Sequence, residues 1–210
     1  TVMHNNEGNA EIMNSAVPTL VQMCIAAEDI RSIVGTNGAS GLSSIITMIS
    51  NHPEYTQSTE AGVRLLAKMA SSQKQDNKAE LIEAGAIVAT TLAMAANPDS
   101  EITQVHGIKV MSVLSGEPSY GKYIVDTGVV QSVISGLEQF VDNRNFVLDS
   151  FSLLSKLTQE QNNGRDATIL ALKTEEGLEA LTTAIVNYGD DAKIKMLVSG
   201  VLGGIVEKND

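Results

Sequence analysis

The sequence repeats one helical pattern, in which a small residue is followed by large apolar residues three, four and seven positions later. The clearest copy lies in Glu60–Ala70, where Gly62 precedes Leu65, Leu66 and Met69. This spacing places the apolar side chains on one face of a helix. The small residues that begin the five copies, here called anchors, are Ala16, Gly62, Gly107, Ser150 and Ser199. The first and last copies match less well, because Thr19 and Gly203 occupy positions of the apolar pattern. Successive anchors lie 43 to 49 residues apart, and a helical pattern with this period predicts an α-solenoid.

The residues between the anchors also follow a repeated order. Each repeat reads as a short helix, a glycine turn, a medium helix, a break rich in Asn, Asp or Pro, and a long helix. We expect Gly85, Gly128 and Gly177 each to end a short helix, because glycine readily adopts the left-handed turn of a helix C-cap. The expected long helices span 54–70, 101–114, 144–158 and 191–206. No stretch alternates polar and apolar residues, so no strands are expected.

The first repeat is less regular than the others. A leading helix is expected from Ala10, capped by Asn9 and kinked or delayed by Pro18. A short helix at 28–34 and a glycine-rich turn at 35–41 follow. Residues 1–9 are polar and are expected to fray, and the first residue is not Met, which suggests a piece of a longer protein.

Composition limits the core and the partners of this chain. Its 210 residues suit one repeat domain over 1–210, and with 3% aromatic residues and no Trp the core must be aliphatic. The single cysteine, Cys24, cannot form a disulfide within the chain and is expected in the core. A net charge of −11 disfavours nucleic acid as a partner. No signal peptide and no membrane-spanning run is visible, so direct membrane insertion is not expected and a cytoplasmic location is.

The pattern resembles the armadillo repeat. The resemblance is best in LIEAGAIVATTL (81–92), in YIVDTGVVQSVI (123–134) and in the long helices. HEAT repeats are the main alternative, but they usually have two helices and no such glycine turn. The resemblance implies an all-α, right-handed solenoid of about four three-helix repeats plus a leading helix. It also implies that the third helices line a concave face, where extended peptides bind in the family.

The family's nuclear-import adaptors carry Trp two positions after the anchor and Asn six positions after it. The first of these positions holds Pro18, Arg64, Lys109, Ser152 and Val201 here. The second holds Gln22, Lys68, Val113, Lys156 and Ile205. Neither Trp nor Asn occurs at any of them, so we reject a receptor for nuclear-localisation signals.

Cations occupy several of these positions instead. The predicted partner-binding groove comprises Arg64, Lys68, Lys109 and Lys156, with His106 at its border. In the armadillo family, which the chain resembles, a basic groove can pair with acidic, extended partners. We therefore predict a non-enzymatic scaffold or adaptor that binds an acidic or phosphorylated protein segment. The competing interpretation is that these cations are ordinary solvated residues.

No set of residues predicts catalysis, a metal site or a cofactor site. No Ser/His/Asp or Cys/His set is visible, and His4 and His52 lie in breaks between helices. The turn at 35–41 lacks the Gly-Lys-Ser/Thr ending of a phosphate loop. The acidic pairs at 175–176 and 190–191 each begin a helix, where negative charge complements the helix dipole.

The last expected helix is apolar on nearly every side. Its sequence MLVSGVLGGIV (196–206) suggests an end interface through Val198, Val201, Leu202 and Ile205. Three explanations are considered: a longer array that continues, self-association, or a partner domain that covers the end. The alternative function is a structural or regulatory module, which docks to cytoskeletal or small-GTPase partners through its ends or convex face, as in armadillo-like regions of formins.

Overall fold

The structure is a computed structural model that describes residue 6 and residues 9–26, 39–72 and 76–206. Within these residues the chain is all-helical and contains no strand, as the sequence predicts. The expected helix at 28–34 and the start of the turn at 35–41 lie outside them. The first helices are α1 (Ala10–Ala26), α3 (Ala39–Asn51), α4 (Thr56–Ala70), α5 (Asp76–Glu83), α6 (Ala86–Ala96) and α7 (Glu101–Leu114). The later ones are the 3-10 helix η2 (Pro118–Tyr120) and α8 (Gly121–Asp126), α9 (Val129–Gln139), α10 (Arg144–Leu157), α11 (Arg165–Leu172), α12 (Glu175–Tyr188) and α13 (Ala192–Val206).

The chain divides into two compact units, which are described separately here. Unit 1 is Thr1–Val110 and unit 2 is Met111–Asp210, so the boundary falls within α7. The expectation of one repeat domain over the whole chain stays a prediction.

Unit 1 packs helices that are three labels apart along the chain. α1 packs on α4, and α3 packs on α6. The helices that follow one another are also in contact, α3 with α4 and α5 with α6. A helix therefore buries its apolar face against both its chain neighbour and the helix one repeat away.

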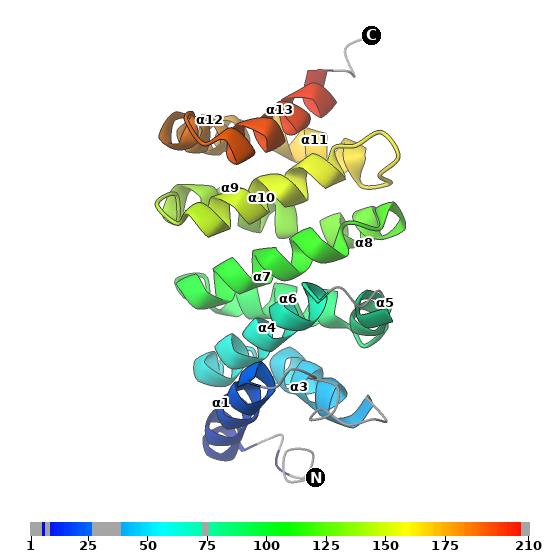
Figure 1. Cartoon of the computed structure of the whole chain (residues 1–210), viewed down its shortest axis with the longest axis vertical. Helices are drawn as coiled ribbons and strands as arrows, with labels where there is room; N and C mark the ends of the chain where they lie inside the picture. The colour runs from blue at the N-terminus through cyan, green and yellow to red at the C-terminus, as the bar shows by residue number, and fades with distance from the viewer. Residues whose placement is uncertain (1–5, 7–8, 27–38, 73–75, 207–210) are drawn as a thin grey trace. The chain divides into compact units, whose positions relative to one another are not determined.

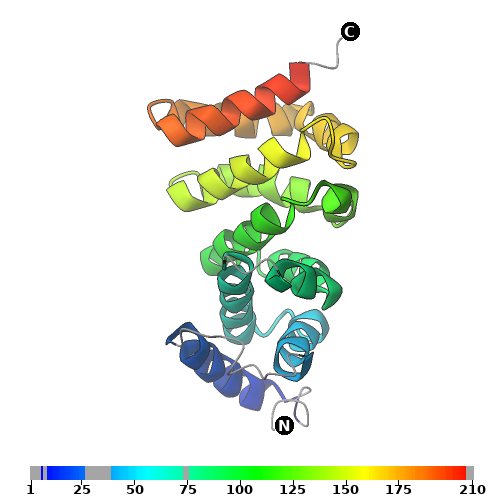
Figure 2. The same cartoon turned by 45° about the vertical axis from the view of Figure 1, so that its right-hand side comes forward.

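Unit 2 shows the same order of contacts. α8 packs on α11, α9 on α12, and α10 on α13. α10 and α13 lie side by side in both Figure 1 and Figure 2. Unit 2 thus contains two three-helix sets, α8–α10 and α11–α13, whose equivalent members are in contact.

Polar side chains join successive sets of helices through hydrogen bonds that span 41 to 44 residues. In unit 1, Asn97 follows α6, and its Nδ2 donates to the carbonyl of Pro53, 44 residues earlier, at 2.7 Å. Its Oδ1 accepts from Thr56 Oγ1 at 2.9 Å. Asn14 and Ser58, also 44 residues apart, are joined by a 2.7 Å hydrogen bond between Ser58 Oγ and Asn14 Oδ1. These hydrogen bonds give partners to polar groups that would otherwise be buried without one.

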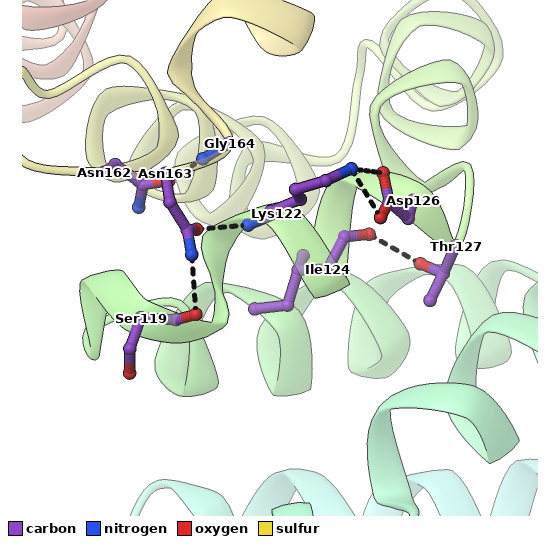
Figure 3. Close-up of polar contacts among 8 residues, drawn as sticks. All are labelled: Ser119, Lys122, Ile124, Asp126, Thr127, Asn162, Asn163 and Gly164. Atoms are coloured by element: carbon purple, nitrogen blue, oxygen red, sulfur yellow. Dashed lines mark hydrogen bonds and ion pairs between the residues drawn. The ribbon is translucent and has the colours of Figure 1, made fainter.

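An equivalent tie in unit 2 is drawn in Figure 3. Asn163 Oδ1 accepts from the backbone N of Lys122 at 2.5 Å, and its Nδ2 donates to the carbonyl of Ser119 at 2.9 Å. Asn162 is buried, and its Oδ1 accepts from the backbone N of Gly164 at 2.9 Å. We call residues 162–164 the Asn clamp, because they hold the loop before α11 on the start of α8.

Two of the three predicted glycine turns are confirmed. Gly85 and Gly128 have φ values of 89° and 87° and lie between α5 and α6 and between α8 and α9. This left-handed conformation is strained for residues with a side chain. The prediction for Gly177 is wrong, because α11 ends at Leu172 and Thr174 caps α12 by accepting from the N of Gly177 at 3.1 Å. The sequence also contained a helix-start signal that competes with the glycine, because the hydroxyl of Thr174 lies three residues before the N–H group of Gly177.

The apolar positions of the repeated pattern form the core in the middle copies. Leu65, Leu66 and Met69 are buried in α4, and the corresponding positions of α7 and α10 are buried as well. In the last copy Leu202 and Val206 are exposed, so there the pattern does not mark the core.

The anchors are small because neighbouring helices approach them closely. A Cβ on Gly62 would lie 2.7 Å from Ile49 Cδ1, and one on Gly107 would lie 2.5 Å from Met94 Sδ. Ser150 is fully buried. Ser199, the anchor of the weakest copy, is exposed, and Gly204 instead makes the close approach from α13, to the carbonyl of Thr158.

We expect Asn97→Ala to destabilise the chain by about 2–3 kcal/mol, because three hydrogen bonds of a buried side chain are lost and the Pro53 carbonyl keeps only the 3.3 Å hydrogen bond from Thr59 Oγ1. The midpoint of urea unfolding, followed by circular dichroism, measures this change. Asn187→Ala, at an exposed position of α12, serves as the control. Equal midpoints for the two variants would show that the Asn97 tie contributes nothing.

Candidate functional site

A hollow of about 270 Å³ lies in unit 1 where α1, α4 and α7 meet. α1 contributes Pro18 and Gln22, the two positions that the family comparison singles out on this helix. α4 contributes a face that includes Gln57, Glu60 and Arg64. The remaining lining residues are Asn14, Val21, Ala61 and Ile102. The hollow therefore lies on the third helices of their sets, where the groove is predicted.

Arg64 is the cationic residue among those that line this hollow, and so it is the group that attracts an anion. Its side chain is half-buried, and no hydrogen bond or ion pair joins its guanidinium to the described part of the chain. Glu60, one turn earlier, is held elsewhere, since its Oε1 accepts from Ser100 Oγ at 2.6 Å. The Glu60 carboxylate lines the same hollow but forms no ion pair with Arg64 within the described residues, so an anion that reaches the guanidinium can form charge-assisted hydrogen bonds with it.

Carboxamide groups surround Arg64. Gln22 on α1 and Gln57 on α4 are exposed, and neither forms a hydrogen bond within the described residues. Asn14 is half-buried and accepts from Ser58. A carboxamide offers both a donor and an acceptor, which a peptide backbone also does. The sequence comparison missed Gln57, although its spacing of seven residues from Arg64 places both on one helical face.

The other predicted groove residues of unit 1 have different surroundings. Lys68 is exposed one turn after Arg64, and His106 and Lys109 are half-buried on α7. All three take part in interactions within the protein. None of them lines the hollow, so of the predicted groove residues the hollow contains Arg64 alone.

In unit 2, the predicted groove residue Lys156 has a structural contact. Its Nζ donates to the carbonyl of Ser112, in the last turn of α7. Arg165 acts similarly, with Nε donating to the carbonyl of Thr158 and Nη2 to that of Gly204, both at 3.2 Å. The last carbonyls of a helix have no partner within it, so cations at these places satisfy them.

The predicted end interface is partly enclosed. Val198 and Val201 are buried on α13, which packs on α10, and Ile205 is half-buried. The side chains of Val198 and Val201 belong to the unit's own core, and the end interface stays a prediction. Leu202 is 43% exposed, and Met196 and Val206 are each 65% exposed. Sequence pattern alone did not show which side of this apolar helix faces α10.

The acidic pair at 190–191 has a structural explanation. Asp191 Oδ1 accepts from the backbone N of Lys193 at 3.0 Å and of Ile194 at 3.1 Å, which caps α13. Its Oδ2 accepts from Arg144 Nε, at the start of α10, at 2.7 Å. The hydrogen bond from Arg144, and then that from Ile194, lowers the pKa of Asp191 below its ordinary value of 3.8. Burial, and next the Asp142 carboxylate, raises the pKa of nearby Tyr188 above 10.0.

Within the described residues, no group of three or more His, Cys, Asp or Glu side chains is arranged to hold a metal ion. No described helix combines the length and the apolar character that crossing a membrane requires.

We expect Asp191→Asn to lower the melting temperature at neutral pH, where the wild-type carboxylate is ionised and bound to Arg144. A carboxylate whose pKa is lower in the folded chain stabilises the fold fully at pH values above its ordinary pKa of 3.8. This stabilisation is lost as the pH falls through the pKa of the folded chain. The difference in melting temperature between wild type and Asp191→Asn should therefore shrink at pH values below the pKa of Asp191 in the folded chain. Asn keeps a capping oxygen, so the comparison isolates the charge.

Thermal unfolding across a pH series measures this effect, with Asp190→Asn at the neighbouring exposed position as the control. If the melting temperatures of wild type and Asp191→Asn differ by the same amount at every pH, the role of the Arg144 contact is contradicted.

No protein-family model, no curated protein and no solved structure matches this chain.

Proposed function

We propose that this chain is a non-enzymatic, armadillo-like α-solenoid that binds an extended acidic segment of a partner protein across α1, α4 and α7 of unit 1. The observation that carries the proposal is the half-buried guanidinium of Arg64, which has no hydrogen bond or ion pair to the described residues and lies beside a hollow on these helices.

The repeat type is supported by the order of helix contacts. Equivalent helices of successive three-helix sets pack together in each unit. The polar ties of the loops span 44 residues in several places, close to the spacing of the sequence anchors. Stacked three-helix sets with glycine turns are typical of armadillo arrays and not of two-helix repeats.

The size of the hollow favours a polymer over a small molecule. Sites for drug-sized ligands enclose roughly 300–1,000 Å³ and are mostly apolar. The hollow of about 270 Å³ is smaller and carries Arg, Glu, Gln and Asn side chains. Such a hollow accepts one or two side chains of a segment whose remainder lies across the neighbouring helices.

Charge and hydrogen-bonding capacity favour an acidic segment in extended form. Arg64 can bind a carboxylate or phosphate through two parallel N–H groups. The exposed carboxamides of Gln22 and Gln57 can pair with main-chain N–H and C=O groups, which an extended segment leaves free. The acidic partner thus supplies the counter-charge that Arg64 lacks within the described residues.

We expect short peptides selected on the intact chain from a random displayed library to be rich in Asp and Glu. A selected peptide should bind Arg64→Gln at least about tenfold more weakly, because a charge-assisted hydrogen bond contributes about 1.5–3 kcal/mol. Replacing the acidic residues of the peptide by Asn and Gln should weaken binding similarly. Fluorescence anisotropy of labelled peptides measures both effects.

Lys78→Gln is the matched control, since Lys78 is an exposed cation on α5 of the same unit and does not line the hollow. Circular dichroism checks that both variants fold. Selected peptides without acidic enrichment, or equal affinities for Arg64→Gln and Lys78→Gln, would contradict the proposal.

A further inference from the structure

The Asn clamp contains the dipeptide Asn163–Gly164, whose chemistry differs from that of other asparagines. In a flexible Asn-Gly pair, the backbone nitrogen of Gly attacks the side-chain carbonyl carbon of Asn. A C–N bond forms, the bond to the side-chain nitrogen breaks, and ammonia leaves with the proton of the attacking nitrogen. Water then opens the resulting succinimide, which leaves aspartate or isoaspartate. Glycine favours this reaction because it has no side chain to hinder ring closure.

In the folded chain, the clamp occupies every group that this reaction needs. The attacking nitrogen, that of Gly164, donates its hydrogen to Asn162 Oδ1 at 2.9 Å. The carboxamide of Asn163 is held at both ends, by the backbone N of Lys122 and by the carbonyl of Ser119. These contacts point the carboxamide towards η2 and α8 (Figure 3).

Close packing limits movement of the loop. Asn162 is buried, and a Cβ on Gly164 would lie 2.7 Å from the backbone C and O of Gly121. The backbone rotation that ring closure needs therefore requires the clamp to open.

We propose that Asn163 is a site of spontaneous deamidation, that the closed Asn clamp suppresses the reaction, and that the product prevents the clamp from reforming. The rate at this site then reports how often the loop before α11 leaves α8. The inference is independent of peptide binding in unit 1.

The product is incompatible with the clamp for two reasons. Aspartate at 163 can still accept from the N of Lys122, but its second oxygen would face the carbonyl of Ser119 without a hydrogen to donate. Isoaspartate adds a methylene to the backbone next to Gly164, where the approach of Gly121 leaves no space. Either product therefore loses at least one of the two hydrogen bonds that hold residue 163 on η2 and α8.

The test measures aspartate and isoaspartate at residue 163 by peptide mass spectrometry, after incubation of the full chain at mildly alkaline pH with and without urea. We expect the rate in urea to exceed the native rate at least about tenfold, since reaction then no longer requires local opening. Asn37–Gly38, the other Asn-Gly pair of the sequence, gives the reference rate of an unfolded pair in urea. Equal native and urea rates at Asn163, or no product in urea, would overturn the proposal.

Two variants open the clamp by different routes. Asn162→Ala removes the acceptor of the Gly164 N–H group, and Gly121→Ala places a Cβ 1.8 Å from Asn162 Oδ1. Both should raise the native rate at Asn163 several-fold. A folded variant that reacts at the wild-type rate would show that these contacts do not protect the site, and the urea comparison decides the matter if both variants unfold.

The effect of the product is tested with Asn163→Asp. Its melting temperature should fall below that of Gln161→Glu, which adds the same charge at an exposed position of the same loop. Equal melting temperatures would refute the claim that the product disables the clamp.

Discussion

The structure depends on contacts between helices that lie three labels apart along the chain within each unit. An amphipathic helix such as α4 gains little stability alone, because its apolar face must be removed from water. In unit 1, α4 buries that face against α1 and α3, and in unit 2, α10 buries its face against α9 and α13. Polar loops can end these helices only because ties such as Asn97 and the Asn clamp satisfy their backbone groups at the same interval.

The same demand for satisfied polar groups divides the cations into two classes. Lys156 and Arg165 bind carbonyl groups at the ends of helices, and so they stabilise unit 2. Arg64 has no such contact within the described residues and lies beside a hollow. A cation without a contact of this kind is the better candidate for binding a partner protein. A cation that caps a helix would have to break that contact before it could bind a partner.

The helices were largely predictable from the sequence because their signals are local. The expected span 101–114 coincides with α7, since proline and capping residues mark where this helix begins. Gly177 was misassigned because a local glycine signal competed with Thr174, and the hydroxyl cap prevailed. The site was predicted less well: Arg64 was identified by its position on α4, but the roles of Lys156 and Gln57 depend on residues distant in sequence.

The sequence by itself determined that this chain is all-helical and that its helices recur every 43–49 residues, because both follow from the spacing of apolar and turn residues along the chain. Only the tertiary structure decided which polar side chains are already bound and which are available. It also decided that Val198 and Val201 face inward while Leu202 faces out. These outcomes depend on contacts between residues some 40 positions apart, and no local pattern encodes the partner of a side chain.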